Sequence, residues 1–141
     1  MYAFLCNFRP RSVNAVYKTS YYNELKTSFQ RYHGVAAPLT ENLYGFVYYF
    51  YRANAQLDAD NLSKPIWDAL RDIAYADDRL IRFRSAGTFD LQNEGIDVLD
   101  ISDIPDYLID DFLRMIDTES HILYVEFGRL DYKLFRFQYE K

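Results

Sequence analysis

The sequence has very little cysteine and no long apolar run, and both absences exclude classes of protein. The single cysteine, Cys6, cannot form a disulfide with a second one in the same chain. No apolar stretch is long enough to cross a bilayer, and residues 1–5 lack the basic segment and long apolar core of a secretory signal. We therefore expect a cytoplasmic protein with no membrane partner, and neither a disulfide scaffold nor a membrane-spanning protein.

Glycine and proline are also scarce, with 5 and 4 residues among 141. No linker, internal repeat or low-complexity tract interrupts the chain, which is 50% apolar and 18% aromatic. Disordered and collagen-like chains have far more glycine, proline and charge. We expect one domain over residues 1–141 around a single core.

Basic residues are fewer than acidic ones, 16 against 21, for a net charge of −5. A deficit of this kind normally argues against a nucleic-acid partner. However, residues 90–119 hold ten of the acids and the single base Arg114, so the remainder of the chain is 15 − 11 = +4. We interpret the segment at about 90–119 as an acidic helix with a solvated face and flanking loops. Nucleic acid then remains a candidate partner for the rest of the surface.

Apolar periodicity and turn residues predict an α/β (α+β) fold, in which helices pack on a mixed sheet. The predicted order is β-α-β-α-β-α-β-β. Residues 1–8 read as an internal strand, because they are apolar on both faces. On the strand 80–85, alternation puts Arg82 and Arg84 on one face. The remaining elements are strands at 43–51, 122–127 and 132–139, the last two as a hairpin, and helices at 20–32, 61–73 and about 104–115.

Acidic and basic side chains gather around the second predicted helix. Asp58 and Asp60 are two residues apart in an extended segment, so their carboxylates point the same way. Lys64 and Asp68 have helical i, i+4 spacing. The pair Asp77-Asp78 follows the helix, and an antiparallel return would bring one of them beside Asp58 and Asp60. Three converging carboxylates suit Mg²⁺, which supports phosphodiester hydrolysis.

Each part of this cluster also has a purely structural interpretation. Asp60 or Asn61 could cap the helix, Lys64 could pair with Asp68 on the surface, and Asp77-Asp78 could be a turn. An EF-hand is excluded because Ser63 and Ala69 stand where its loop needs glycine and glutamate. A phosphotransferase of the Asp-x-Asp type remains a weak alternative.

These residues resemble the RusA family of Holliday-junction resolvases. The similar residues follow the family's order of Asp-x-Asp-Asn-Leu-x-Lys, Asp-Ala-Leu and Asp-Asp, and a second element, an apolar strand followed by Pro, Ser-Val-Asn and Tyr, agrees with it. In this chain they are Asp58, Asp60, Asn61, Leu62, Lys64, Asp68, Ala69, Leu70, Asp77 and Asp78, with Pro10, Ser12, Val13, Asn14 and Tyr17 in the second element.

The resemblance implies a Mg²⁺-dependent endonuclease, with Mn²⁺ able to substitute, that acts on branched DNA as a homodimer. It implies Asp58, Asp60 and Asp78 as metal ligands and catalytic residues, with Asp77 as the other candidate for the third ligand. Lys64 would be the essential base near the scissile phosphate. Two alternatives stay open, namely a protein that binds branched DNA or a replication protein without cutting, and a small-molecule phosphohydrolase.

DNA contacts are expected from the basic part of the chain. The candidate residues are Arg9, Arg11, Asn14, Lys18, Arg82 and Arg84.

Overall fold

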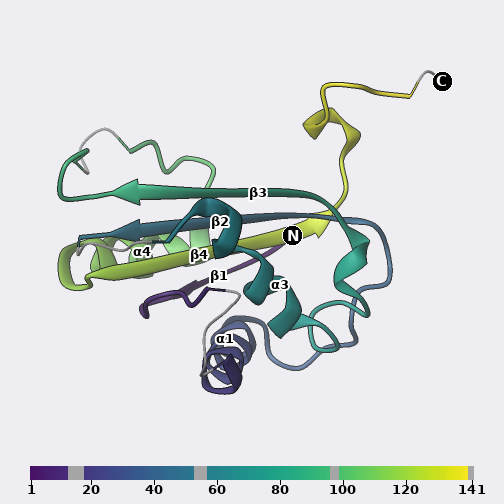
Figure 1. Cartoon of the computed structure of the whole chain (residues 1–141), viewed down its shortest axis with the longest axis horizontal. Helices are drawn as coiled ribbons and strands as arrows, with labels where there is room; N and C mark the ends of the chain where they lie inside the picture. Colours follow the sequence, from purple (N-terminus) through teal and green to yellow (C-terminus); the bar gives the residue numbers. More distant parts are fainter. Residues whose placement is uncertain (13–17, 53–56, 96–98, 140–141) are drawn as a thin grey trace.

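The centre of the fold is a four-stranded mixed sheet, whose strands lie one below another in Figure 1. The computed structural model describes residues 1–12, 18–52, 57–95 and 99–139, so the prediction for Asn14 lies outside the described residues. The strands are β1 (Tyr2–Cys6), β2 (Leu43–Tyr51), β3 (Ile81–Asp90) and β4 (His121–Arg129), in the spatial order β1-β4-β2-β3. β4 is antiparallel to β1 and β2, whereas β2 and β3 are parallel, which confirms the mixed sheet.

Helices cover both faces of this sheet. On one face lie α1 (Lys18–His33) and α3 (Lys64–Leu70), preceded by the single turn α2 (Ala59–Leu62). On the other face lies α4 (Asp106–Thr118). Each layer has its own apolar core, and the two cores include Trp67 and Phe112, respectively. Among the described residues, no helix combines the length and the apolar character needed to cross a membrane.

Two strand predictions are corrected by the sheet. β1 is an edge strand, not an internal one, and it is apolar on both faces because α1 and α4 pack on either side of it. The predicted strand 132–139 is wrong, since this segment holds a short 3₁₀ turn (η2, Tyr132–Leu134) and no strand in its described residues. β1 and β2 already occupy both hydrogen-bonding edges of β4, so a hairpin partner has no place to pair.

The crossover between β2 and β3 also differs from the prediction. The expected helix 61–73 is divided at Ser63 into α2 and α3, because Pro65 has no N–H to donate to the carbonyl of Asn61, four residues earlier, and so cannot continue α2. A β-bulge at the start of β3 then breaks the expected alternation. Ile81 and Arg84 face α3, while Phe83 lies on the opposite face beside Phe46.

Candidate active site

Lys64 begins α3, and its side chain forms the predicted i, i+4 ion pair. Its Nζ atom lies 3.5 Å from Oδ2 of Asp68. The Lys64 side chain is 57% exposed and that of Asp68 29% exposed, so the ammonium group faces solvent while the carboxylate is partly enclosed. An exposed pair of this kind contributes little to stability. Because the Lys64 ammonium group is exposed and its ion pair is weak, a phosphate can approach it.

Asp78 lies in the 3₁₀ turn η1 (Asp78–Leu80), at the point where the chain enters β3. Its side chain is only 15% exposed and is held by two arginines, Arg71 at 3.7 Å and Arg84 at 3.5 Å. Arg84 also donates hydrogen bonds to the backbone carbonyls of Asp78 at 2.6 Å and Ile81 at 3.1 Å. Arg84 therefore stabilises the turn that carries Asp78.

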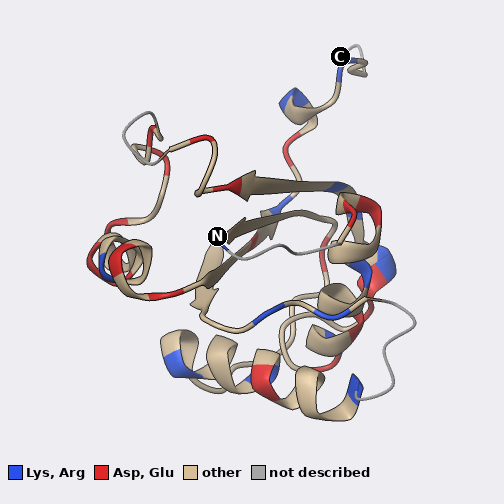
Figure 2. Ribbon diagram, turned by 60° about the vertical axis from the view of Figure 1, so that its left-hand side comes forward, with Lys and Arg blue, Asp and Glu red and all other residues tan. Residues whose placement is uncertain are grey.

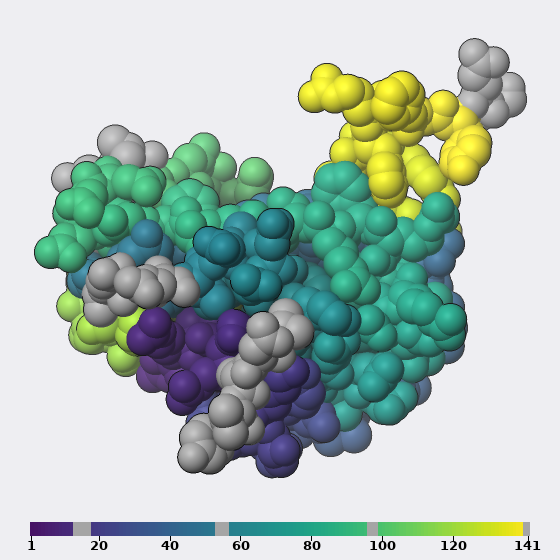
Figure 3. Space-filling view, viewed as in Figure 1, coloured from purple at the N-terminus to yellow at the C-terminus, as the bar shows by residue number. Residues whose placement is uncertain are grey.

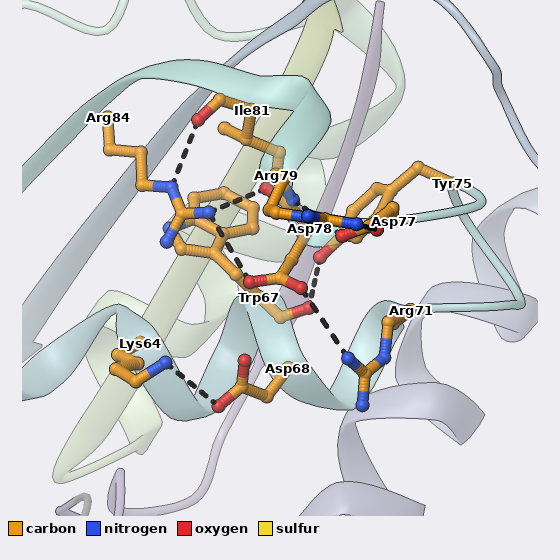
Figure 4. Close-up of polar contacts among 10 residues, drawn as sticks. All are labelled: Lys64, Trp67, Asp68, Arg71, Tyr75, Asp77, Asp78, Arg79, Ile81 and Arg84. Atoms are coloured by element: carbon orange, nitrogen blue, oxygen red, sulfur yellow. Dashed lines mark hydrogen bonds and ion pairs between the residues drawn. The ribbon is translucent and has the colours of Figure 1, made fainter.

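Asp77 has a different role from its neighbour. Its carboxylate accepts hydrogen bonds from the backbone and side chain of Arg79, at 2.9 to 3.1 Å, and so caps the 3₁₀ turn. Those hydrogen bonds lower the pKa of Asp77 to about 2. Of the two adjacent acids, Asp78 is therefore the one that faces α3, as Figure 4 shows.

A buried tyrosine connects α3 to this turn. Tyr75 is fully buried, and its hydroxyl donates a hydrogen bond to the backbone carbonyl of Trp67. Burial raises the pKa of Tyr75 well above its usual value, and the charges of Asp78, Arg84, Asp68 and Arg71 also act on it. Figure 4 shows Tyr75 together with these four charged side chains. Sequence reasoning missed Arg71 and Tyr75, because nothing local to either residue indicates that Arg71 pairs with Asp78 or that Tyr75 donates a hydrogen bond to Trp67.

Asp58 and Asp60 lie at the other end of the crossover, both exposed, where Asp58 precedes α2 and Asp60 belongs to it. The antiparallel return that was expected to bring Asp77 or Asp78 beside them is wrong, because β2 and β3 are parallel. α2 instead packs against α3 and β3. Within the described ranges, no three acidic, histidine or cysteine side chains are grouped closely enough to form a ready metal site. The donor chemistry suits a hard divalent cation, since all the candidate donors are carboxylate oxygens.

The candidate DNA contacts are divided between the two ends of the sheet. Arg9 and Arg11 follow β1 and, with the start of α1, line a cleft of about 380 Å³. Lys18 is the first residue of α1. Arg82 belongs to the amino end of β3, which is the opposite end of the sheet, and donates a 3.2 Å hydrogen bond to the Tyr132 hydroxyl.

The acidic segment lies away from the surface that carries Lys64 and Asp78. α4 buries Leu108, Phe112 and Ile116 against the far face of the sheet and exposes Asp106 and Asp110 to solvent. Figure 2 shows acidic residues along α4 and the loop before it, and α4 lies on the opposite face of the sheet from α1 and α3. One acid of α4, Asp111, accepts a 2.8 Å hydrogen bond from the Tyr32 hydroxyl near the end of α1. Asp106, Asp110 and Asp117 therefore face solvent, as their pattern along the chain predicts, whereas Asp111 is only partly exposed.

The βαβ crossover thus presents Lys64, Arg71 and Arg84 beside the carboxylates of Asp68 and Asp78. The family model described as endodeoxyribonuclease RusA matches residues 11–98, more than half of the chain, and the chain belongs to this family. Membership supports an endodeoxyribonuclease, because the family implies Holliday-junction endonucleases, which are generally metal-dependent. A search among curated proteins finds no match.

Proposed function

We propose that this protein is a Mg²⁺-dependent endonuclease that resolves four-way DNA junctions by hydrolysing phosphodiester bonds. The observation that carries the proposal is the charged surface of α3 and η1 in a chain of the RusA family. On that surface Lys64 pairs with Asp68, and Asp78 lies between Arg71 and Arg84. This arrangement combines cations for phosphates with a carboxylate for a metal.

The proposed metal ligands are Asp58, Asp60 and Asp78, whose carboxylate oxygens are the donors that Mg²⁺ prefers. When bound, the ion would supply an activated water and would stabilise the charge that develops on the phosphate. Arg71 and Arg84 form ion pairs with Asp78 and hold its carboxylate in place. Asp68 would orient the Lys64 ammonium group toward the scissile phosphate.

A homodimer would complete the proposed function. A four-way junction must be cut on two opposed strands, so two copies of one site related by twofold symmetry match the substrate. Arg9, Arg11 and Lys18 would contact phosphates beside the cleft that follows β1. Whether the dimer forms is measurable by sedimentation of the purified protein.

The test compares Asp60→Asn with Asp117→Asn, which makes the same charge change on the exposed, opposite side of the molecule, on α4. A labelled four-way junction is incubated with each protein, with Mg²⁺ and with a chelator, and both cleavage and binding are measured. We expect Asp60→Asn to lose cleavage by at least about a hundredfold while junction affinity is kept or increases, because a repulsive charge is removed. Asp117→Asn should cut as the unmodified protein does.

Three results would contradict the proposal. Equal cutting by Asp60→Asn would remove Asp60 from the site. Binding of the junction without cutting by the unmodified protein would indicate a branched-DNA binding module. Hydrolysis of a chromogenic phosphate ester, together with no activity on DNA, would indicate a small-molecule phosphohydrolase.

A further inference from the structure

The segment Tyr132–Tyr139, which we call the C-terminal arm, projects from the body of the molecule beyond the end of β4. It is visible as the yellow ribbon in Figure 1 and the yellow atoms in Figure 3. Of its large apolar side chains, Phe137 is 88% exposed and Tyr139 79% exposed. Exposed aromatic rings that are concentrated in one short segment indicate a binding surface and not ordinary surface variation.

The arm is aromatic and basic at the same time. Between Tyr132 and Tyr139 it contains four aromatic residues, Lys133 and Arg136, and no acid. The rings of Tyr132 and Tyr139 lie 5.5 Å apart, and those of Tyr132 and Phe135 lie 5.7 Å apart. The arm and β3 together enclose a hollow of about 310 Å³, lined by Arg82, Tyr132, Phe135, Phe137, Gln138 and Tyr139. Aromatic faces together with cations are typical of surfaces that stack nucleobases.

Two contacts attach the arm to the strand that follows Asp78. Arg82 donates a hydrogen bond to the Tyr132 hydroxyl, and the Phe83 and Phe135 rings meet edge to face at 5.0 Å. Both residues of the body lie in the first three positions of β3, directly after the turn that carries Asp78. β3 is also an edge strand, so a nucleic-acid strand can pass around it from the Asp78 side to the arm.

We propose that the hollow between the C-terminal arm and Arg82 binds an unpaired nucleobase of the DNA substrate by stacking, with Arg82, Lys133 and Arg136 facing the adjacent phosphates. This inference rests on the proposed function and identifies where the opened strand of a branched substrate is held. A paired base cannot enter because its faces are covered by its neighbours. The arm therefore selects single-stranded DNA at a branch point over continuous duplex.

The experiment measures binding in the absence of divalent metal, so that cleavage plays no part. The probe is a single-stranded oligonucleotide that carries the fluorescent base 2-aminopurine, with a duplex of equal length for comparison. Phe137→Ala with Tyr139→Ala removes two lining rings, and Leu134→Ala is the matched control, because Leu134 lies in the same arm but does not line the hollow. Sedimentation of each variant reports its oligomeric state.

We expect the double variant to bind the single strand at least about tenfold more weakly and to lose the quenching of 2-aminopurine that stacking produces. Duplex affinity and the control variant should change less than about threefold. Unchanged affinity and quenching in the double variant would overturn the proposal. So would a loss of dimer with single-strand affinity intact, which would assign the arm to contacts with a second copy of the chain. If the double variant still cuts the junction and its binding is unaltered, the stacking site is rejected and the proposed nuclease function stands. If the unmodified protein quenches 2-aminopurine but does not cut the junction, the stacking site stands and the proposed nuclease function is rejected.

Discussion

Gly45, the third residue of β2, is the position where the structure predicts the largest effect of one added methyl group. A Cβ atom at this residue would lie 2.6 Å from Cζ2 and 2.7 Å from Cη2 of Trp67, and 3.0 Å from Cγ2 of Ile81. Carbon atoms in contact normally lie about 3.5–4.0 Å apart. Trp67 belongs to α3 and is fully buried, so it cannot move aside without shifting that helix. Glycine is therefore required here by close packing of α3 on the sheet.

The expected cost of Gly45→Ala is that of overpacking a core, roughly 1–3 kcal/mol in the free energy of unfolding. Gly87→Ala is the matched control, because a Cβ there would lie 3.5 Å from the nearest atom, Cδ1 of Tyr48, which is an ordinary contact. Neither glycine has a positive φ, so both substitutions restrict the unfolded chain in the same way. The difference between the two variants thus isolates the clash with Trp67 and Ile81.

Urea unfolding, followed by the fluorescence of Trp67, measures both variants, because the chain contains 1 tryptophan. The midpoint of Gly45→Ala should fall with an unchanged denaturant slope, and its Tm should drop by roughly 2–4 °C for each kcal/mol of destabilisation. Since α3 carries Lys64 and Asp68, catalytic activity should fall as well. Stabilities of the two variants that agree within about 0.5 kcal/mol would refute the packing argument.

Three further outcomes are expected. The carboxyl group of Asp77 should titrate by NMR near its pKa of about 2, and Arg79→Ala should return that pKa toward 3.8; an unchanged titration in the variant would contradict the assignment. Because folding lowers this pKa, the contact stabilises the folded state above about pH 3.8, and this stabilisation is lost as the pH falls through 2. Burial raises the pKa of Cys6 to about 12, so a thiol reagent at about pH 8 should label it only after unfolding, and rapid labelling of the folded protein would show that the strand is accessible. Replacing Asp106, Asp110 and Asp111 by Asn should change junction affinity by less than about tenfold. Replacing Arg9 and Arg11 by Ala should weaken junction affinity and reduce its salt slope by about one unit for each phosphate that is no longer neutralised. A much larger gain in affinity from the aspartate changes at low salt would mean that the acidic segment covers the DNA-binding face.

Local pattern was sufficient for elements whose partners are close in sequence. A run that is apolar or aromatic at odd and even positions alike located β2 at Leu43–Tyr51. Apolar spacing of i, i+3 and i, i+4 located α1 within two residues of each end. The same reasoning failed at 132–139, where an aromatic pattern typical of a strand predicted a hairpin with β4, because β4 is already paired with β1 and β2. Strand pairing depends on residues distant in the chain, and a local pattern contains no information about which edges remain free.

The candidate site likewise contains contacts that local spacing predicts and contacts that depend on packing between distant residues. The amino-acid order was enough to predict the Lys64–Asp68 pair, since helical geometry places residues i and i+4 side by side, and the order of the motif residues indicated the RusA family. Three-dimensional packing was needed to show that β2 and β3 are parallel, that Asp77 turns to Arg79, and that Asp78 lies between Arg71 and Arg84. Adjacent residues point in different directions at a turn, and which of them meets the crossover helix depends on how α3 packs against the sheet. The metal ligand set, Asp58, Asp60 and Asp78, stays a prediction, because convergence of carboxylates across a parallel crossover is a property of that packing and not of spacing along the chain.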